Sequence, residues 1–162
     1  MKLQLINRQT QQKIDAKAIR NFLQKLATKL QEETPHMKWS EIACILLDDD
    51  QTRVANQHVF GRNESTDVIT QHYEPLPPHA EGYTAEILIN IHRAREEGQR
   101  RGDPDRELAL YIAHGCLHLT GADDLTPADQ AAMSRTQEAW LDELLPGTPA
   151  FFMHHQPPQS PA

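Results

Sequence analysis

Residues 41–47, EIACILL, constrain the fold of this chain more than any other segment because they form an almost continuous apolar run. A run of this length, bounded by polar residues, is typical of a buried β-strand. Asp48, Asp49 and Asp50 follow directly and suit the N-terminal cap of a helix that ends at Gly61. The sequence therefore predicts a strand that passes at once into a helix.

The spacing of apolar residues elsewhere predicts the remaining elements. Further strands are expected at residues 3–7, 67–73 and 84–91. Helices are expected between Asp15 and Pro35, at residues 92–101 and 105–120, and from the cap at Thr126 to Leu145. This order of elements predicts an α+β fold, in which about five helices pack on a small mixed four-stranded sheet.

The length of 162 residues and a hydrophobic content of 38% suffice for one ordinary core, so residues 1–146 are expected to form a single domain. Residues 147–162 are rich in proline and lack sustained periodicity, so we expect a mobile tail. No apolar stretch approaches the length of a membrane span, and the first residues lack the pattern of a secretory signal. We therefore expect a soluble, cytoplasmic protein that does not bind membranes.

Charge and cysteine content narrow the function further. A net charge of -7 argues against binding nucleic acid by bulk electrostatics. Five arginines between residues 90 and 106 could form a local positive patch or a solvated helix face with ion pairs. Cys44 and Cys116 lie in apolar runs, as buried thiols do, and we expect neither a disulfide nor a zinc site from them.

Two histidines carry the strongest chemical signal. His114 and His118 are four residues apart in a predicted helix, so their imidazoles share one face and can bind one ion. Gly121 ends that helix and lets Asp123 or Asp124 supply a third ligand. Two histidines and a carboxylate suit zinc, with a fourth position left to water, although manganese and nickel are compatible with the same ligands. The prediction is a metal site at the end of a central helix.

A metal-bound water would be the catalytic nucleophile of such a site, because the ion lowers the water pKa from about 15.7 to about 7. The alternative is a pair of partly buried histidines with a structural role only. The residue after His114 is Gly115, whereas a metalloprotease of the HExxH type needs a glutamate there as general base. The histidine pair therefore does not indicate that class of protease.

The segment HGCLHLTGADD, residues 114–124, closely resembles HGxLHLxGYDH, the signature of the YbeY family of bacterial endoribonucleases that mature ribosomal RNA. Residues 65–70 resemble the family segment PT(N/D)VLSF, residues 85–89 resemble its GDIVI strand, and residues 130–145 resemble its acidic closing helix. The resemblance covers about residues 40–145.

The resemblance implies a single-strand-specific, metal-dependent endoribonuclease that acts in ribosomal RNA processing. It further implies one divalent ion, most simply Zn²⁺, with precursor ribosomal RNA and the ribosomal small subunit as partners. The metal ligands would be His114, His118 and Asp124. The family has a histidine at the third position, so Asp124 adds negative charge and weakens the Lewis acidity of the ion.

Two other positions depart from the family pattern. Family members carry an arginine before the glycine of an RG segment, whereas this chain has Phe60 and Gly61, with Arg62 following. Arg62 either takes over the catalytic role by stabilising charge on a phosphodiester, or is a solvated loop residue. Glu86 replaces a family aspartate and would keep a carboxylate near the site, or cap a strand edge.

Two other functions stay open on the sequence alone. A metal-dependent amidase or peptidase would use the same ligands to polarise a carbonyl, with Glu86 as the nearest candidate base. A non-catalytic, ribosome-associated RNA-binding module would fit the acidic composition and the missing arginine. Cleavage assays on RNA and on protein substrates separate these functions.

Overall fold

The computed structural model describes residues 1–76, 78, 81–146 and 152–154. The strands within these residues are β1 (Lys2–Asn7), β2 (Trp39–Leu47), β3 (Val68–Tyr73) and β4 (Tyr83–Asn90). The helices are α1 (Ala16–Glu33), α2 (Asp49–Phe60), α3 (Ile91–Arg101), α4 (Pro104–His118) and α5 (Pro127–Leu144). The predicted α+β fold, with a four-stranded mixed sheet and five helices, is confirmed.

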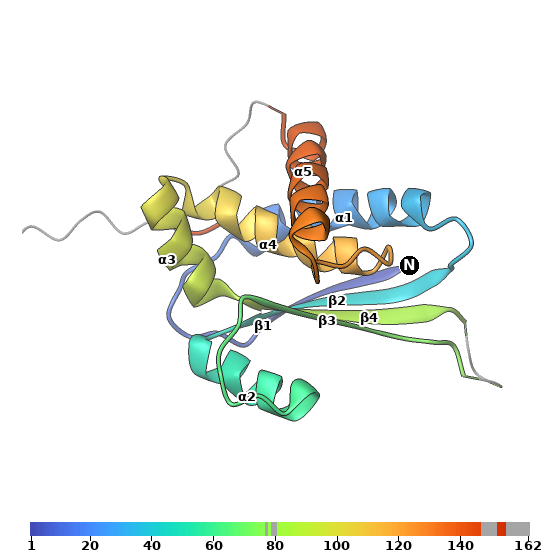
Figure 1. Ribbon diagram of the computed structural model, residues 1–162, viewed down its shortest axis with the longest axis horizontal. Helices are drawn as coiled ribbons and strands as arrows, with labels where there is room; N and C mark the ends of the chain where they lie inside the picture. Colours follow the sequence, from blue (N-terminus) through green and yellow to red (C-terminus); the bar gives the residue numbers. More distant parts are fainter. Residues whose placement is uncertain (77, 79–80, 147–151, 155–162) are drawn as a thin grey trace, which may run out of the picture.

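The sheet has the strand order β1-β2-β4-β3. β1 and β4 both run parallel to β2, whereas β3 pairs antiparallel with β4. Figure 1 shows α2 on one face of the sheet, with α1, α4 and α5 on the other. Since both faces of β2 are covered, its continuous apolar sequence is the pattern expected of a central parallel strand.

Alternation along β2 divides its side chains between two clusters of unequal size. Cys44 and Leu46 belong to the large core between the sheet and α1, α4 and α5. Ala43, Ile45 and Leu47 form a smaller cluster, against which Ala55 of α2 packs. The side of the sheet that α4 covers therefore holds most of the buried apolar surface.

Local capping signals account for most helix bounds. α2 begins after Asp48 and ends at Gly61, which adopts a left-handed φ of 69°, as predicted. The strand predicted at residues 84–91 ends at Asn90, whose side chain accepts a hydrogen bond from Arg93 N and thereby starts α3. α4 ends at His118, before the predicted residue 120, because Leu119 N and Thr120 N bond three residues back, to Cys116 O and Leu117 O.

The prediction of a mobile tail after Pro146 is wrong for Phe152 and Met153. These side chains are 2% and 4% exposed, and both backbone N–H groups donate to Asp105 Oδ1, at 3.0 and 2.8 Å. Met153 also forms an antiparallel bridge with Ile14, and the Phe152 ring lies 5.5 Å from that of Phe22. Burial of these two large apolar side chains, together with the hydrogen bonds to Asp105, holds this part of the chain against the core. Residues 147–151 and 155–162 lie outside the described residues.

None of the helices that the structure describes combines the length and apolar character needed to cross a membrane.

Candidate metal centre

α4 brings the two predicted histidines together at its C-terminal end. His114 Nε2 and His118 Nε2 are 3.1 Å apart. Asp124 Oδ2 lies 3.5 Å from the first of these nitrogens and 4.0 Å from the second. One ligand atom from each residue lies within 4.8 Å of the others, so the three residues form a group that could hold a metal ion.

A tight turn returns Asp124 to the end of α4. Gly121 takes a left-handed φ of 92°, a conformation that side chains with a Cβ adopt at a cost. Gln130 Nε2 of α5 then donates to Asp124 O at 3.0 Å and holds the backbone of the turn. Asp123 is oriented differently, since its carboxylate accepts from Leu125 N at 3.4 Å and lines another cavity. Of the two acids considered from the sequence, Asp124 is the one beside the histidines.

Hydrogen bonds at the far side of each ring orient the imidazoles. His118 Nδ1 donates to Ala122 O at 3.2 Å, because a backbone carbonyl can only accept. His114 Nδ1 lies 3.1 Å from the amide oxygen Oε1 of Gln137 on α5. With the proton on Nδ1 in each ring, both Nε2 lone pairs point toward the shared space beside Asp124.

The spacing of these atoms fits a single divalent ion. Ligands about 2.0 to 2.1 Å from a tetrahedral zinc ion lie about 3.3 Å from each other. The three pairwise separations of 3.1, 3.5 and 4.0 Å are close to that value. Two nitrogen lone pairs and a carboxylate at this distance repel one another unless a cation lies between them, so the arrangement suits a bound ion. The donor set and geometry therefore suit a metal ion.

Gly115 lets α4 approach the sheet closely. A Cβ at this position would lie 2.4 Å from Ile87 Cγ2 and 3.1 Å from Thr70 Oγ1. The Thr70 hydroxyl also donates to Gly115 O at 3.1 Å, which fastens the helix to β3. The glutamate that a HExxH protease carries at this position would collide with the sheet, so the geometry agrees with the sequence in disfavouring that class.

The group opens into a cleft of about 650 Å³, in which Arg62 also takes part. This places the sequence-predicted Arg62 in the same cleft as the two histidines and Asp124, with its side chain exposed. The lining residues are Asn56, Phe60, Arg62, Glu64, Thr66, Asp67, Val68, Ile69, Thr70, His72, His114, His118, Asp124 and Leu125. A second cavity of about 600 Å³ shares Asp67, Val68 and His114 with it. Two open cavities therefore adjoin each other at His114.

Glu86 does not lie where the sequence suggested. Successive side chains of a strand point to opposite faces of the sheet. Ile87 faces α4 and the large core, whereas Leu88 packs on the small cluster beside α2. Glu86 therefore points to the face opposite α4, and the expectation that it keeps a carboxylate near the site is wrong.

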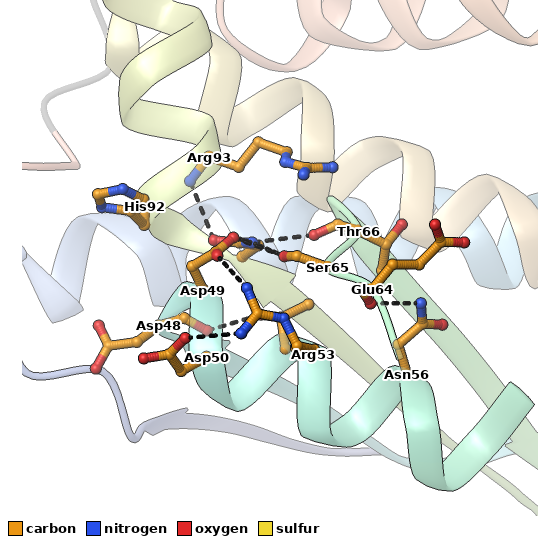
Figure 2. A network of polar contacts seen from close by, with 12 residues as sticks. Asp48, Asp49, Asp50, Arg53, Asn56, Glu64, Ser65, Thr66, His92 and Arg93 are labelled. Carbon is orange, nitrogen blue, oxygen red and sulfur yellow. Dashed lines mark hydrogen bonds and ion pairs between the residues drawn. The ribbon is translucent and has the colours of Figure 1, made fainter. Parts of the chain in front are cut away.

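A polar network that sequence reasoning missed holds the wall of the cleft opposite α4. Asn90 is fully buried, and its Nδ2 donates to Asp49 Oδ1, Ser65 Oγ and Thr66 O, at 2.9, 3.0 and 3.0 Å. Ser65 Oγ donates to the same Asp49 oxygen at 2.6 Å (Figure 2). These bonds, with that of Ser65 the largest cause, hold the pKa of Asp49 below its usual value. The only signal in the sequence was a polar residue at the end of an apolar strand.

The fold and the site together define an α+β protein with a candidate metal centre in an open cleft. The family model described as Endoribonuclease YbeY matches residues 4–145, and the chain belongs to this family. The family predicted from the sequence is therefore confirmed.

Two relatives named Endoribonuclease YbeY illustrate the match. The protein from Rhodopirellula baltica is 35% identical over 97 residues, which cover 58% of this chain and 48% of that protein. The protein from Thermus thermophilus is 32% identical over 102 residues, which cover 62% of this chain and 73% of that protein. The chain thus matches about half the length of the first relative and about three quarters of the second.

A solution structure of a protein from Thermotoga maritima has a similar fold. It superposes with a TM-score of 0.59 and 21% sequence identity, and the match covers 88% of each chain. At this identity the likeness supports the fold alone.

Proposed function

We propose that this chain is a metal-dependent endoribonuclease that cleaves single-stranded RNA during ribosomal RNA maturation. One observation carries the proposal: His114, His118 and Asp124 converge at the floor of an open cleft, in a chain that belongs to the YbeY family. The names of its relatives support RNA as the substrate. The proposal includes precursor ribosomal RNA and the ribosomal small subunit as partners, and the cytoplasm as the compartment.

His114, His118 and Asp124 would hold one divalent ion, for which we propose Zn²⁺. When bound, such an ion supplies a Lewis acid that activates water and stabilises the negative charge developing on a phosphodiester. The hydrogen bonds to Gln137 and Ala122 keep the histidine rings in the orientation that binding requires. The two imidazole rings are therefore oriented before an ion binds, and binding costs little of their rotational freedom.

Arg62 is the second functional residue that we propose. Arg62 lines the same cleft as His114, His118 and Asp124, and Gly61 alone separates it from the position at which the family has an arginine. A planar, permanently charged group can bind two oxygens of one phosphate at once. Arg62 would therefore bind the phosphate and stabilise the charge that develops on it.

Cleavage of defined substrates tests the function. The purified, metal-loaded protein is expected to cut a single-stranded oligoribonucleotide faster than the same sequence in a duplex, and His114→Ala to abolish the cleavage. Casein is the control substrate for the amidase or peptidase alternative. Cleavage of casein without cleavage of RNA would overturn the proposal, as would rRNA processing in cells that His114→Ala leaves unchanged.

Metal content tests the ligands separately. Asp124→Ala is expected to lower the bound metal per protein markedly, whereas Asp123→Ala is the matched control and should retain it, because its carboxylate is directed away from the histidines. Asp124→His introduces the family's residue and should also retain metal. Elemental analysis of the purified proteins gives the answer, and equal occupancy in wild type and Asp124→Ala would show that Asp124 is not a ligand.

A further inference from the structure

Two large apolar side chains stand exposed beside the candidate metal centre. Phe60 is 59% exposed and Leu125 is 84% exposed, and both line the cleft that contains His114, His118 and Asp124. They belong to different elements, since Phe60 ends α2 and Leu125 follows Asp124 in the turn. Exposed aromatic surface in a cleft is a feature of binding sites and contributes nothing to the core.

The end of α2 places an aromatic ring and a cation two positions apart in the sequence, with Gly61 between them. Gly61 caps the helix with a φ of 69°, and its N–H donates to Gln57 O at 3.0 Å. The chain reverses at this residue, and the residues before and after it, Phe60 and Arg62, both line the cleft. A residue with a Cβ at position 61 would strain this turn.

Buried polar groups hold the segment that follows the turn. Asn56 is 5% exposed, and its Nδ2 donates to Glu64 O at 2.8 Å. Asn90 Nδ2 donates to Ser65 Oγ and Thr66 O and holds these two residues in place. A ligand that binds the turn therefore meets a wall whose backbone is already ordered, and little conformational entropy is lost on binding.

An unpaired nucleobase fits this surface better than other ligands. Aromatic side chains stack on the faces of unpaired bases, whereas bases in a duplex already stack on each other. The net charge of -7 leaves little general attraction for a polyanion, so a substrate RNA needs affinity from a source other than charge. Stacking on Phe60, with the phosphate on Arg62, supplies that affinity next to the metal-binding side chains.

We propose that Phe60 stacks on one unpaired base of single-stranded RNA and so determines the preference of the site for single strands. The inference rests on the proposed function, because it takes RNA as the ligand. It adds a binding role for a residue at which the family carries an arginine.

A binding experiment tests the stacking. The affinity of metal-loaded protein for a labelled single-stranded oligoribonucleotide is measured by fluorescence anisotropy. Phe60→Ala is expected to weaken binding by about 5- to 150-fold, which corresponds to the range measured for loss of a stacked base. Phe60→Trp should retain the affinity. Val54→Ala is the matched control, because Val54 lies on the same helix, is 70% exposed and is absent from the cleft lining.

Two further readouts distinguish stacking from a structural role. Trp39 and Trp140, the chain's own tryptophans, are 2% and 5% exposed, so quenching by RNA in the Phe60→Trp variant would report a base on the new ring. An abasic residue moved along the oligonucleotide should weaken wild-type binding at one position. At that position Phe60→Ala should show no further loss, because the two changes remove the same contact.

The outcomes separate this inference from the function on which it rests. RNA cleavage with the same KM in wild type and Phe60→Ala, and equal sensitivity of both to abasic residues, would overturn the stacking role alone. Absence of both RNA binding and RNA cleavage in the wild type would overturn the stacking role and the proposed function together. A raised KM with little change in kcat for Phe60→Ala supports a base-binding role.

Discussion

The two helices that end at the cleft, α4 and α2, are held in place by opposite means. α4 buries eleven of its fifteen residues, and most of these are apolar. α2 buries only Thr52 and Asn56, and both are polar. α4 lies in the large core, whereas α2 rests on the small cluster and on hydrogen bonds.

The two helices therefore support different parts of the site. The histidines lie on the more deeply packed of the two helices, so the candidate ligand atoms keep their spacing. The opposite wall, with Phe60 and Arg62, is fixed by directional bonds from Asn56 and Asn90. Apolar packing therefore sets the position of the proposed chemistry, and polar bonds set the position of the proposed substrate contacts.

The largest expected effect is a cavity in α4. Ile112 is fully buried, so Ile112→Ala should lower the free energy of unfolding by about 2 to 5 kcal/mol. Val54→Ala, on the exposed face of α2, should change it by less than about 0.5 kcal/mol. Urea denaturation followed by circular dichroism measures both. Similar losses in the two variants would remove the distinction between the helices.

Asn90→Ala tests whether polar bonds alone hold the wall. The buried amide nitrogen shares its two N–H groups among three oxygens, and its loss leaves Thr66 O and Asp49 without that partner. We expect a loss of about 1 to 3 kcal/mol in unfolding free energy. Hydrogen exchange should rise in residues 61–67 and stay unchanged in α4. Faster exchange in α4 as well would mean that the two walls are not independently supported.

In the Gly115→Ala variant, higher helix propensity should stabilise the protein, whereas crowding against the sheet should destabilise it. Alanine favours a helix over glycine by about 1 kcal/mol, but its Cβ would meet Ile87 Cγ2 at 2.4 Å. Ile87 is fully buried and branched at Cβ, so overpacking should dominate and leave a net loss of about 1 to 2 kcal/mol. Thermal unfolding shows whether Gly115→Ala is less or more stable than the wild type. If the variant were more stable than the wild type, Ile87 of β4 would have to be able to move aside, and α4 would be less tightly packed than the contacts indicate.

Ser65→Ala should have the smallest effect, and that effect should depend on pH. The Ser65 hydroxyl is the main reason for the lowered pKa of Asp49, so its loss should raise that pKa toward the usual value. A lowered pKa in the folded state stabilises the protein above about pH 4, and the contribution disappears as the pH falls and Asp49 is protonated. The variant should lose about 0.5 to 1 kcal/mol at pH 7.

Urea denaturation of wild type and Ser65→Ala across pH 2 to 7 measures this dependence. The difference between the two proteins should shrink toward the acid end. A difference that is constant with pH would mean that the hydroxyl acts through packing and not through the ionised carboxylate.

Features with local causes could be predicted from the sequence. The bounds of α2 follow from Asp48 and Gly61, and the proximity of His114 and His118 follows from helical spacing. The return of Asp124 also has a local cause, since Gly121 adopts the left-handed turn.

Features that depend on distant contacts could not be predicted. The face to which Glu86 points depends on the register of β4 against β2, which pairs residues about forty positions apart. The role of Asn90 depends on Asp49 and Ser65, which other elements supply. Burial of Phe152 requires Asp105 and Phe22, and no pattern near residue 152 points to them.

The docking of Met153 on Ile14 has a consequence for the kinetics of folding. The two residues are about 140 positions apart, and closing a loop of that size carries an entropic cost that local helices do not have. We expect this contact to form after the rate-limiting step, and thus to slow unfolding more than it speeds folding. Asp105, whose carboxylate receives both backbone N–H groups of this segment, would then act mainly on the lifetime of the native state.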